Sequence, residues 1–281
     1  MERDRLRPIR TVFHPSDFSE GSEVAFYHAL KIALVAGAGL DLLHVRGGGN
    51  VAWTDFPGVR ATLERWGVLP PDSPRRAVGA IGIAARKVVM KGSDPVRVAE
   101  RFLAENPTDL VVLAAHPHRG HMRWTRASVS QPIAQAAAAA ALFLPYGCEG
   151  FISRADGSPT LRSVLLPIVA QPSPGPALEA ARRLTWSLQC PEVTFTLLHV
   201  GGPGEMPAVR TEEQPGWSWC RVTREGDVVE TILRVAGECN ADLIVMATAG
   251  RQGFLEALRG STTERVLRSG AFPLLAIPAT H

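Results

Sequence analysis

The chain has 281 residues, of which 46% are hydrophobic and 20% charged, with a formal net charge of +3. That length accommodates two domains of ordinary size, each able to bury its own core. All but three of the 30 basic residues are arginines, scattered along the chain without a basic run, so the composition argues against a nucleic-acid-binding protein.

The cysteines and the apolar runs narrow the class further. Cys148, Cys190, Cys220 and Cys239 lie far apart and form no C-x-x-C pair, which argues against a zinc knuckle or a thioredoxin-type site and indicates reduced thiols. The longest apolar run, Ala136–Leu144, is far shorter than the roughly 20 residues that cross a bilayer. We therefore expect a cytoplasmic protein without a membrane span.

The first half alternates short apolar runs with segments of helical periodicity. The expected strands are Ile9–Phe13, Leu40–Val45, Arg86–Met90 and Asp109–Ala114, and the expected helices are Glu20–Ala36, Val96–Glu105 and the alanine-rich Ile133–Ala141, followed by an apolar segment that ends at Leu144. Gly37 and Gly39 end the first helix. Between Val45 and Gly92 lies an extra segment with Trp53 and Trp66, where we expect one helix and irregular chain.

The second half repeats this order. Its expected strands are Ser163–Pro167, Val193–Val200, Arg221–Thr223 and Asp242–Ala247, and its expected helices are Ala177–Leu188 and Ile232–Gly237. The stretch Tyr146–Pro159, rich in glycine, serine and charge, is interpreted as the linker. The domains are accordingly placed at residues 1–146 and 159–281.

An internal repeat supports this division. Asp109–Pro145 aligns with Asp242–Pro278 without a gap at a constant offset (242 − 109 = 133), which indicates two copies of one folding unit. Strands that are apolar over most of their length and alternate with helices predict a parallel sheet covered on both faces. The predicted fold class is α/β, with two tandem doubly wound parallel-sheet domains.

A glycine-rich loop follows the fourth expected strand of the second half. Gly250 is followed after nine residues by Gly260 and Ser261, at the start of a helix. Glycines allow backbone N–H groups to approach an anion, and a helix start offers unpaired amides and a positive dipole end. Ser261 and Glu264 also have the spacing of a capping box, so these residues alone leave a phosphate site and a well-capped helix both open.

At this loop the chain resembles the universal stress protein family, whose phosphate loop has the form G-x2-G-x9-G-[ST]. The similarity extends over nearly the whole chain as two tandem copies. The segments that carry it are Pro15–Ser19, Leu43–Val45, Gly250–Ser261, Ser261–Arg268 and Phe272–Pro278.

The resemblance implies a Rossmann-like nucleotide-binding fold with ATP as the expected cofactor. In ATP-binding members an Asp after the first strand and a Val after the second contact adenine, and the glycine loop holds the phosphates. The matching positions are Asp17 and Val45 in the first half, and Val200, Gly250, Gly253, Gly260, Ser261 and Thr262 in the second.

The two halves depart from this pattern in different places. In the first half all three motif glycines are gone, and the loop contains Ala114, Pro117 and Ala127, which restrict close backbone approach. In the second half Ala247 replaces the first glycine and Val169 replaces the adenine-side Asp. We expect separate crevices in the two halves, with any ligand held by the second half.

A histidine cluster and the lack of catalytic motifs bear on the chemistry. His116, His118 and His121 could bind a divalent metal, but no carboxylate stands at ligand spacing, so a divergent surface loop without metal is the favoured interpretation. Catalytic motifs such as G-x-S-x-G and G-x4-G-K-[ST] are missing, and the glycine loop lacks an accompanying lysine or positioned base. We expect no enzyme activity.

Three functional hypotheses remain at this point. The first is a stress-response regulatory protein that senses a nucleotide in its second half and acts on unknown protein partners. The second is a scaffold that has lost ligand binding, and the third is a slow ATPase, which rests on kinship of fold alone. A homodimer could form through the apolar segments Ala141–Leu144 and Leu274–Ile277, or duplication could satisfy that pairing within one chain.

Overall fold

The computed structural model describes residues 9–47, 55–115, 130–248, 262–269 and 272–278. In the first half the strands are β1 (Thr11–Pro15), β2 (Gly39–Arg46), β3 (Ala85–Lys91), β4 (Leu110–Ala115) and β5 (Ala140–Pro145), and the helices are α1 (Glu20–Ala36), α2 (Val59–Arg65), α3 (Arg76–Ala80), α4 (Pro95–Glu105) and α5 (Ser130–Ala137). In the second half the strands are β6 (Ser163–Pro167), β7 (Val193–Val200), β8 (Trp217–Arg224), β9 (Leu243–Thr248) and β10 (Leu274–Pro278), and the helices are α6 (Gly175–Ser187), α7 (Val228–Glu238) and α9 (Thr262–Ser269).

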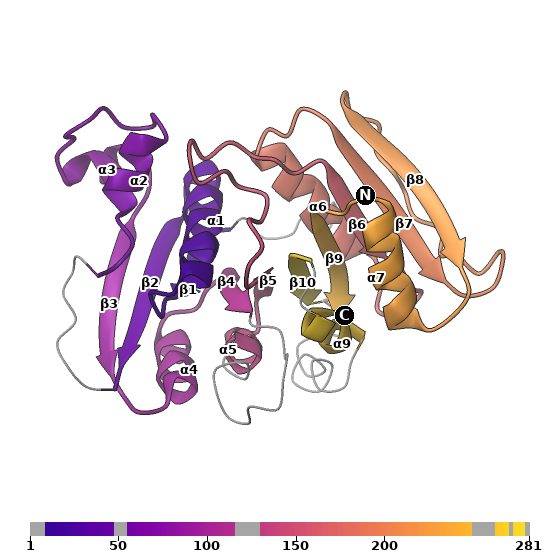
Figure 1. Ribbon diagram of the computed structural model, residues 1–281, viewed down its shortest axis with the longest axis horizontal. Helices are drawn as coiled ribbons and strands as arrows, with labels where there is room; N and C mark the ends of the chain where they lie inside the picture. The colour runs from indigo at the N-terminus through magenta and orange to yellow at the C-terminus, as the bar shows by residue number, and fades with distance from the viewer. Residues whose placement is uncertain (1–8, 48–54, 116–129, 249–261, 270–271, 279–281) are drawn as a thin grey trace, which may run out of the picture.

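These strands form one ten-stranded sheet in the order β3-β2-β1-β4-β5-β10-β9-β6-β7-β8 (Figure 1). Every neighbouring pair is parallel except β5 and β10, which pair antiparallel at the centre. The second half thus repeats the strand order of the first from the other end of the sheet. The predicted α/β class with a doubly wound parallel sheet is confirmed.

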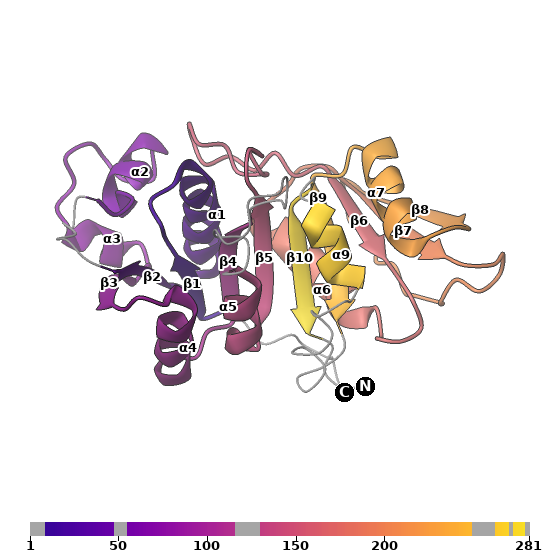
Figure 2. The same ribbon diagram turned by 60° about the horizontal axis from the view of Figure 1, so that its bottom comes forward.

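The central pairing is self-complementary. Leu142 lies opposite Leu275, and the repeat offset makes these two residues equivalent (275 − 142 = 133). Ala141 lies opposite Ala276, and both are fully buried. Figure 2 shows β4, β5, β10 and β9 side by side at the middle of the molecule. The apolar terminal segments therefore pair with each other inside the chain.

Two hydrophobic clusters lie on the two faces of the sheet. One cluster contains the buried residues of α1 and α6, and the other contains those of α4, α5, α7 and α9. Helix α1 starts at the Ser19 cap, whose side chain accepts from the Ser22 N–H, and it ends at Gly37 in the left-handed conformation (φ 60°). The predicted end of this helix is confirmed.

Two predictions were wrong. The helix expected over Ile133–Ala141 ends at Ala137, since Ala138 has a left-handed φ of 48° and Ala140 begins β5. Pairing of β5 with strands on both sides outweighs the helix propensity of alanine there. The extra segment of the first half contains two short helices, α2 and α3, where one was expected.

The expected linker is packed against the first half. Phe151 and Ile152 are buried in the cluster that contains α1, and the Phe151 N–H donates to His28 Nε2 over 2.9 Å. The Trp66 indole N–H donates to the Arg154 carbonyl over 3.3 Å. The linker therefore contributes to the core as well as connecting the halves.

Two buried histidines, His28 and His14, make hydrogen bonds in the neutral state. His28 Nδ1 lies 2.8 Å from the Val24 carbonyl, which can only accept, so Nδ1 carries the proton and Nε2 accepts from Phe151. His14 Nδ1 likewise donates to the Val112 carbonyl over 2.9 Å. Burial lowers the pKa of each histidine from 6.5 to about 4.

We predict a fall in stability below neutral pH. Because both folded pKa values lie below the unfolded value, each histidine stabilises the fold fully above pH 6.5 and loses that contribution as the pH falls toward 4. The difference between 6.5 and about 4 corresponds to roughly 3 kcal/mol for each ring. Urea unfolding between pH 7 and 4 measures it. His28→Gln keeps an acceptor for Phe151 without titrating, so it should reduce the pH slope by about half; an unchanged slope would contradict the assignment.

A second prediction concerns the packed linker. Phe151→Ala should destabilise the protein by about 3–5 kcal/mol, since it leaves a cavity in the core. Trp186→Ala removes an aromatic ring that is 66% exposed and should cost less than about 0.5 kcal/mol. Chemical unfolding compares the two variants. Equal effects would show that the linker does not contribute to the core as described.

Candidate functional site

Each half has a switch point where its first and fourth strands meet. β1 and β4 pair only at Val12–Leu110 and Phe13–Val111, and β6 and β9 pair only through Val164 and Leu165. Both first strands continue beyond these pairs toward their carboxyl ends. In doubly wound sheets, ligands bind in the crevice outside the carboxyl ends at such a point.

Asp17 and Val45 lie at the carboxyl ends of neighbouring strands β1 and β2, as the sequence predicts. Asp17 is exposed, and its Oδ1 accepts from the Ser19 N–H at 3.0 Å and from the Ser19 hydroxyl at 2.6 Å. This contact shapes the turn that leads into α1. Val45 is partly exposed and packs against the cluster that contains α4. Asp17 therefore has a structural role independent of any ligand.

Aromatic side chains gather beside these two residues. Phe18 has a left-handed φ of 62°, and its ring stacks on His44 at a centroid distance of 4.0 Å. Phe56 meets the Phe18 ring edge-on at 5.2 Å. His44 Nδ1 donates to the Ser16 carbonyl over 2.8 Å, so this histidine is both packed and hydrogen-bonded. These rings occupy the space beside the ends of β1 and β2.

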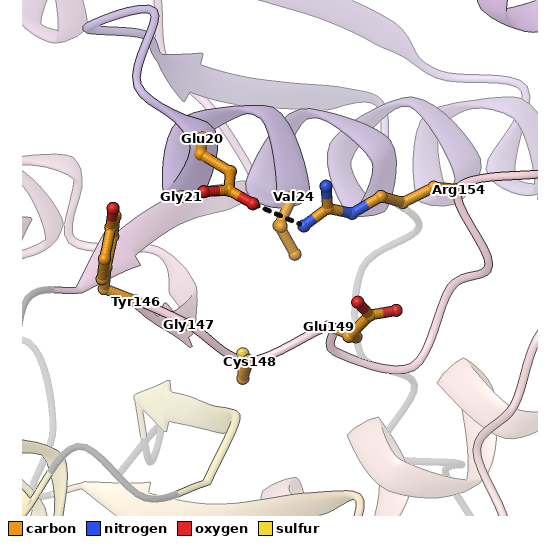
Figure 3. A pocket seen from close by; sticks show the side chains of 8 residues that line it. All are labelled: Glu20, Gly21, Val24, Tyr146, Gly147, Cys148, Glu149 and Arg154. Atoms are coloured by element: carbon orange, nitrogen blue, oxygen red, sulfur yellow. Dashed lines mark ion pairs between the residues drawn. The ribbon is translucent and has the colours of Figure 1, made fainter.

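Tyr146 covers the nearby first turn of α1. A Cβ on Gly21 would lie 2.8 Å from Tyr146 Cδ2 and 3.8 Å from Ala114 Cβ at the end of β4. The adjoining cavity between α1 and the linker holds about 80 Å³, and Figure 3 shows Arg154 reaching across it to Glu20, at 3.8 Å. Nucleotide-sized ligand pockets usually hold ≈ 300–1,000 Å³. This cavity is too small for a nucleotide.

In the second half, Val200 ends β7 and pairs in register with Arg224, and Thr262 is the first residue of α9. Both are partly exposed. The other predicted ligand residues, Gly250, Gly253, Gly260 and Ser261, lie outside the described residues.

The histidine cluster His116, His118 and His121 also lies outside the described part of the chain. Within the described ranges, no group of three or more His, Cys, Asp or Glu side chains is arranged to hold a metal ion.

His199, the counterpart of His44 in the second half, has a hydrogen-bond partner at one of its two ring nitrogens. Nδ1 lies 3.1 Å from the Ile168 carbonyl, whereas the buried Nε2 has no hydrogen-bond partner among the described residues. A Cβ on Gly201 would lie 2.5 Å from His199 Nε2 and 3.0 Å from Glu205 Oε2. Sequence reasoning missed Glu205; Gly201, Gly202 and Gly204 around it were the available signal.

A hollow lies at the carboxyl ends of β7 and β8. It holds about 310 Å³ and is lined by Gly201, Pro203, Thr223, Arg224 and Glu225. In register, Thr223 is the β8 partner of His199. This volume lies at the lower end of the range for small-molecule sites.

The predicted ligand residues of the first half lie far from those of the second half. Asp17 follows β1 and Val200 ends β7, and six steps between neighbouring strands separate these strands in the sheet. At about 4.8 Å per step this amounts to roughly 29 Å. The adenine-side Asp of the first half therefore cannot complete a site at Val200.

The fold and the positions at the strand ends agree with the sequence match. The model of the universal stress protein family matches residues 8–145 and 208–278, about three quarters of the chain. The chain belongs to the universal stress protein family. A universal stress protein of Synechocystis sp. is 33% identical over 115 residues, which cover 41% of this chain and 66% of the relative, just under two thirds of its length.

Solved structures share the fold over nearly the whole chain. A universal stress protein from Archaeoglobus fulgidus is 18% identical with a TM-score of 0.62, and the match covers 96% of this chain and 98% of the other. A putative universal stress protein from Pseudomonas aeruginosa is 14% identical with a TM-score of 0.56, covering 96% and 93%. The tandem arrangement of this universal stress protein thus has structural counterparts.

The structural role assigned to Asp17 can be measured. Asp17→Ala should destabilise the protein by about 1 kcal/mol without any ligand present, since it removes the acceptor for both Ser19 donors. Asp17→Asn keeps an oxygen at Oδ1 and should cost a few tenths at most. Urea unfolding of the nucleotide-free protein compares the variants. An Asp17→Ala protein as stable as the wild type would contradict the structural role.

Proposed function

We propose that this tandem universal stress protein is a cytoplasmic regulatory protein that binds ATP or a related nucleotide in its second half. The observation that carries the proposal is the contrast between the strand ends of the two halves. In the first half Phe18 stacks on His44 and Tyr146 covers the start of α1. In the second half a hollow of about 310 Å³ adjoins the strand that ends at Val200.

The phosphate end of the proposed site is the glycine loop. Gly250, Gly260 and Ser261 match the family pattern in sequence, and Thr262 begins α9 directly after them. Backbone amides and the positive end of the α9 dipole would hold the phosphates, a mode of binding that needs no lysine. All three lysines of the chain, Lys31, Lys87 and Lys91, lie in the first half.

Binding without efficient turnover follows from the same residues. Phosphoryl transfer requires groups that neutralise charge on the transferred phosphoryl and orient the nucleophile. The second half lacks lysine, and its sequence contains no motif that would supply a base at the loop. Nucleotide would instead order the loop and alter a surface read by protein partners, including a second copy of this chain.

The proposal predicts a large effect of charge at one glycine. Saturating ATP at about 100 times Kd should stabilise the wild type by roughly 2.7 kcal/mol, which raises Tm by several degrees. Gly260→Asp places a carboxylate where phosphate would bind and should abolish that shift. Its counterpart Ala127→Asp (260 − 133 = 127) lies in the half expected not to bind and should leave the shift intact.

Thermal unfolding with and without ATP tests this, together with native mass spectrometry of the purified protein for retained nucleotide. A wild type that shows neither a shift nor bound nucleotide would favour the scaffold. Equal losses in Gly260→Asp and Ala127→Asp would place the ligand elsewhere. Turnover of labelled ATP that disappears only in Gly260→Asp would support the slow ATPase instead.

A further inference from the structure

The outer end of the first half carries a concentrated positive charge. Residues 55–91, which include α2, α3 and β3, contain seven arginines and lysines and three acidic residues, a net charge of +4 (7 − 3 = 4). The corresponding connection in the second half, residues 201–224, contains three of each and is neutral (3 − 3 = 0). Since the whole chain carries only +3, this one end exceeds the net charge of the entire protein.

β3 lies at this end as an edge strand of the sheet, and among the described strands it pairs with β2 alone (Figure 1). The Ala84 carbonyl, just before β3, faces β2, where it accepts from the Leu40 N–H. Because backbone groups alternate sides along a strand, those of Lys87 and Val89 face outward. Within the described ranges nothing pairs with them, so this edge can accept another strand.

The side chains of the outward-facing residues share one face of the sheet. In register, Lys87 lies beside Leu42 and Lys91 beside Arg46, on the face that α1 covers. Val89 lies between the two lysines and is 39% exposed. The edge therefore presents a cation, an apolar side chain and a second cation at alternate positions.

The cations at this end are not neutralised by the part of the chain that the structure describes. No ion pair there involves Lys87, Lys91, Arg75 or Arg76. Burial and the nearby Arg75 guanidinium lower the pKa of Lys87, whose ammonium lies 5.7 Å from the centre of the Phe56 ring. An acidic partner would offset this repulsion between cations.

A second copy of this chain does not fit the edge. Pairing β3 with itself would bring Lys87 and Lys91 against the same two residues of the other copy. The other outer strand, β8, contains Arg221 and Arg224 and is cationic too. Like charges on neighbouring strands destabilise the pairing, so the edge favours a partner of opposite charge.

We propose that β3 is a docking edge for an acidic segment of a protein partner, which joins the sheet as an eleventh strand. The backbone of that segment bonds to Lys87 and Val89. On the α1 face its acidic side chains lie opposite Lys87 and Lys91, with an apolar side chain between them opposite Val89. The site is separate from the proposed nucleotide site and defines a class of partner: an extended strand with acidic residues four positions apart.

Fluorescence anisotropy of a labelled peptide, Thr-Glu-Thr-Val-Thr-Glu-Thr, with the full-length protein tests the proposal. The wild type should bind it at least tenfold more tightly than Thr-Glu-Glu-Val-Thr-Thr-Thr, which has the same composition but one glutamate on each face. Lys87→Gln combined with Lys91→Gln should weaken binding at least tenfold. Arg97→Gln combined with Arg101→Gln removes the same charge from α4, on the other face of the sheet, and should change binding less than threefold. Equal binding of the two peptides, or no binding of either, overturns the proposal.

Backbone pairing has a readout of its own. N-methylation removes amide donors, so methylation at the even or at the odd positions of the peptide blocks opposite edges of the added strand. One methylated peptide should bind at least tenfold more weakly than the parent, and the other should stay within threefold. Equal affinities of the two, whether high or low, overturn strand addition.

A change in β3 itself complements the methylated peptides. Val89→Pro removes an outward-facing N–H, which an edge strand tolerates, and should weaken binding at least tenfold. Val89→Thr keeps that N–H and should bind within threefold of the wild type. Circular dichroism and Tm establish that both variants fold. A folded Val89→Pro protein that binds the peptide like the wild type contradicts the docking edge.

Discussion

The antiparallel pairing of β5 with β10 determines how the rest of the molecule is arranged. Leu142 and Leu275 occupy equivalent positions and face each other, so the pairing is isologous, as at a two-fold dimer interface. It removes one open edge from each five-stranded sheet, and the cluster that contains α1 and α6 runs across the join. A homodimer of this chain would need another surface, since these segments are already paired.

The two halves make the same hydrogen bonds at the amino ends of their strands and have different side-chain contacts at the carboxyl ends. Asp109 Oδ2 accepts from the N–H groups of Arg10 and Thr11, and Asp242 Oδ2 accepts from those of Arg162 and Ser163. These repeated contacts tie the first strand of each half to the fourth, which the fold requires. At the carboxyl ends the copies have diverged: Phe18 stacks on His44 in the first half, whereas Gly201 lies against His199 in the second.

The sequence was sufficient to predict local structure wherever a residue's conformation depends on its near neighbours. The apolar runs predicted the strands, Gly37 predicted the end of the first helix, and the fixed repeat offset predicted that the second half repeats the strand order of the first. Ala141 belongs to a strand because it pairs with Val111 of β4 on one side and Ala276 of β10 on the other, which no local pattern encodes. Likewise Glu205 comes close to Gly201 through the turn Gly202–Glu205, so the sequence could indicate a glycine-rich loop but not its contacts.

His44 and His199 are equivalent histidines with the same Nδ1 hydrogen bond and different neighbouring residues. Each stands one residue before the end of the same strand pattern, and each donates Nδ1–H to the carbonyl that follows the first strand's proline. The ring of Phe18, a residue with a left-handed φ of 62°, stacks on His44 at a centroid distance of 4.0 Å. Gly201 lies against the second ring, whose buried Nε2 has no hydrogen-bond partner among the described residues. The two equivalent histidines therefore share their hydrogen bond to the first-strand loop and differ in what packs against the ring.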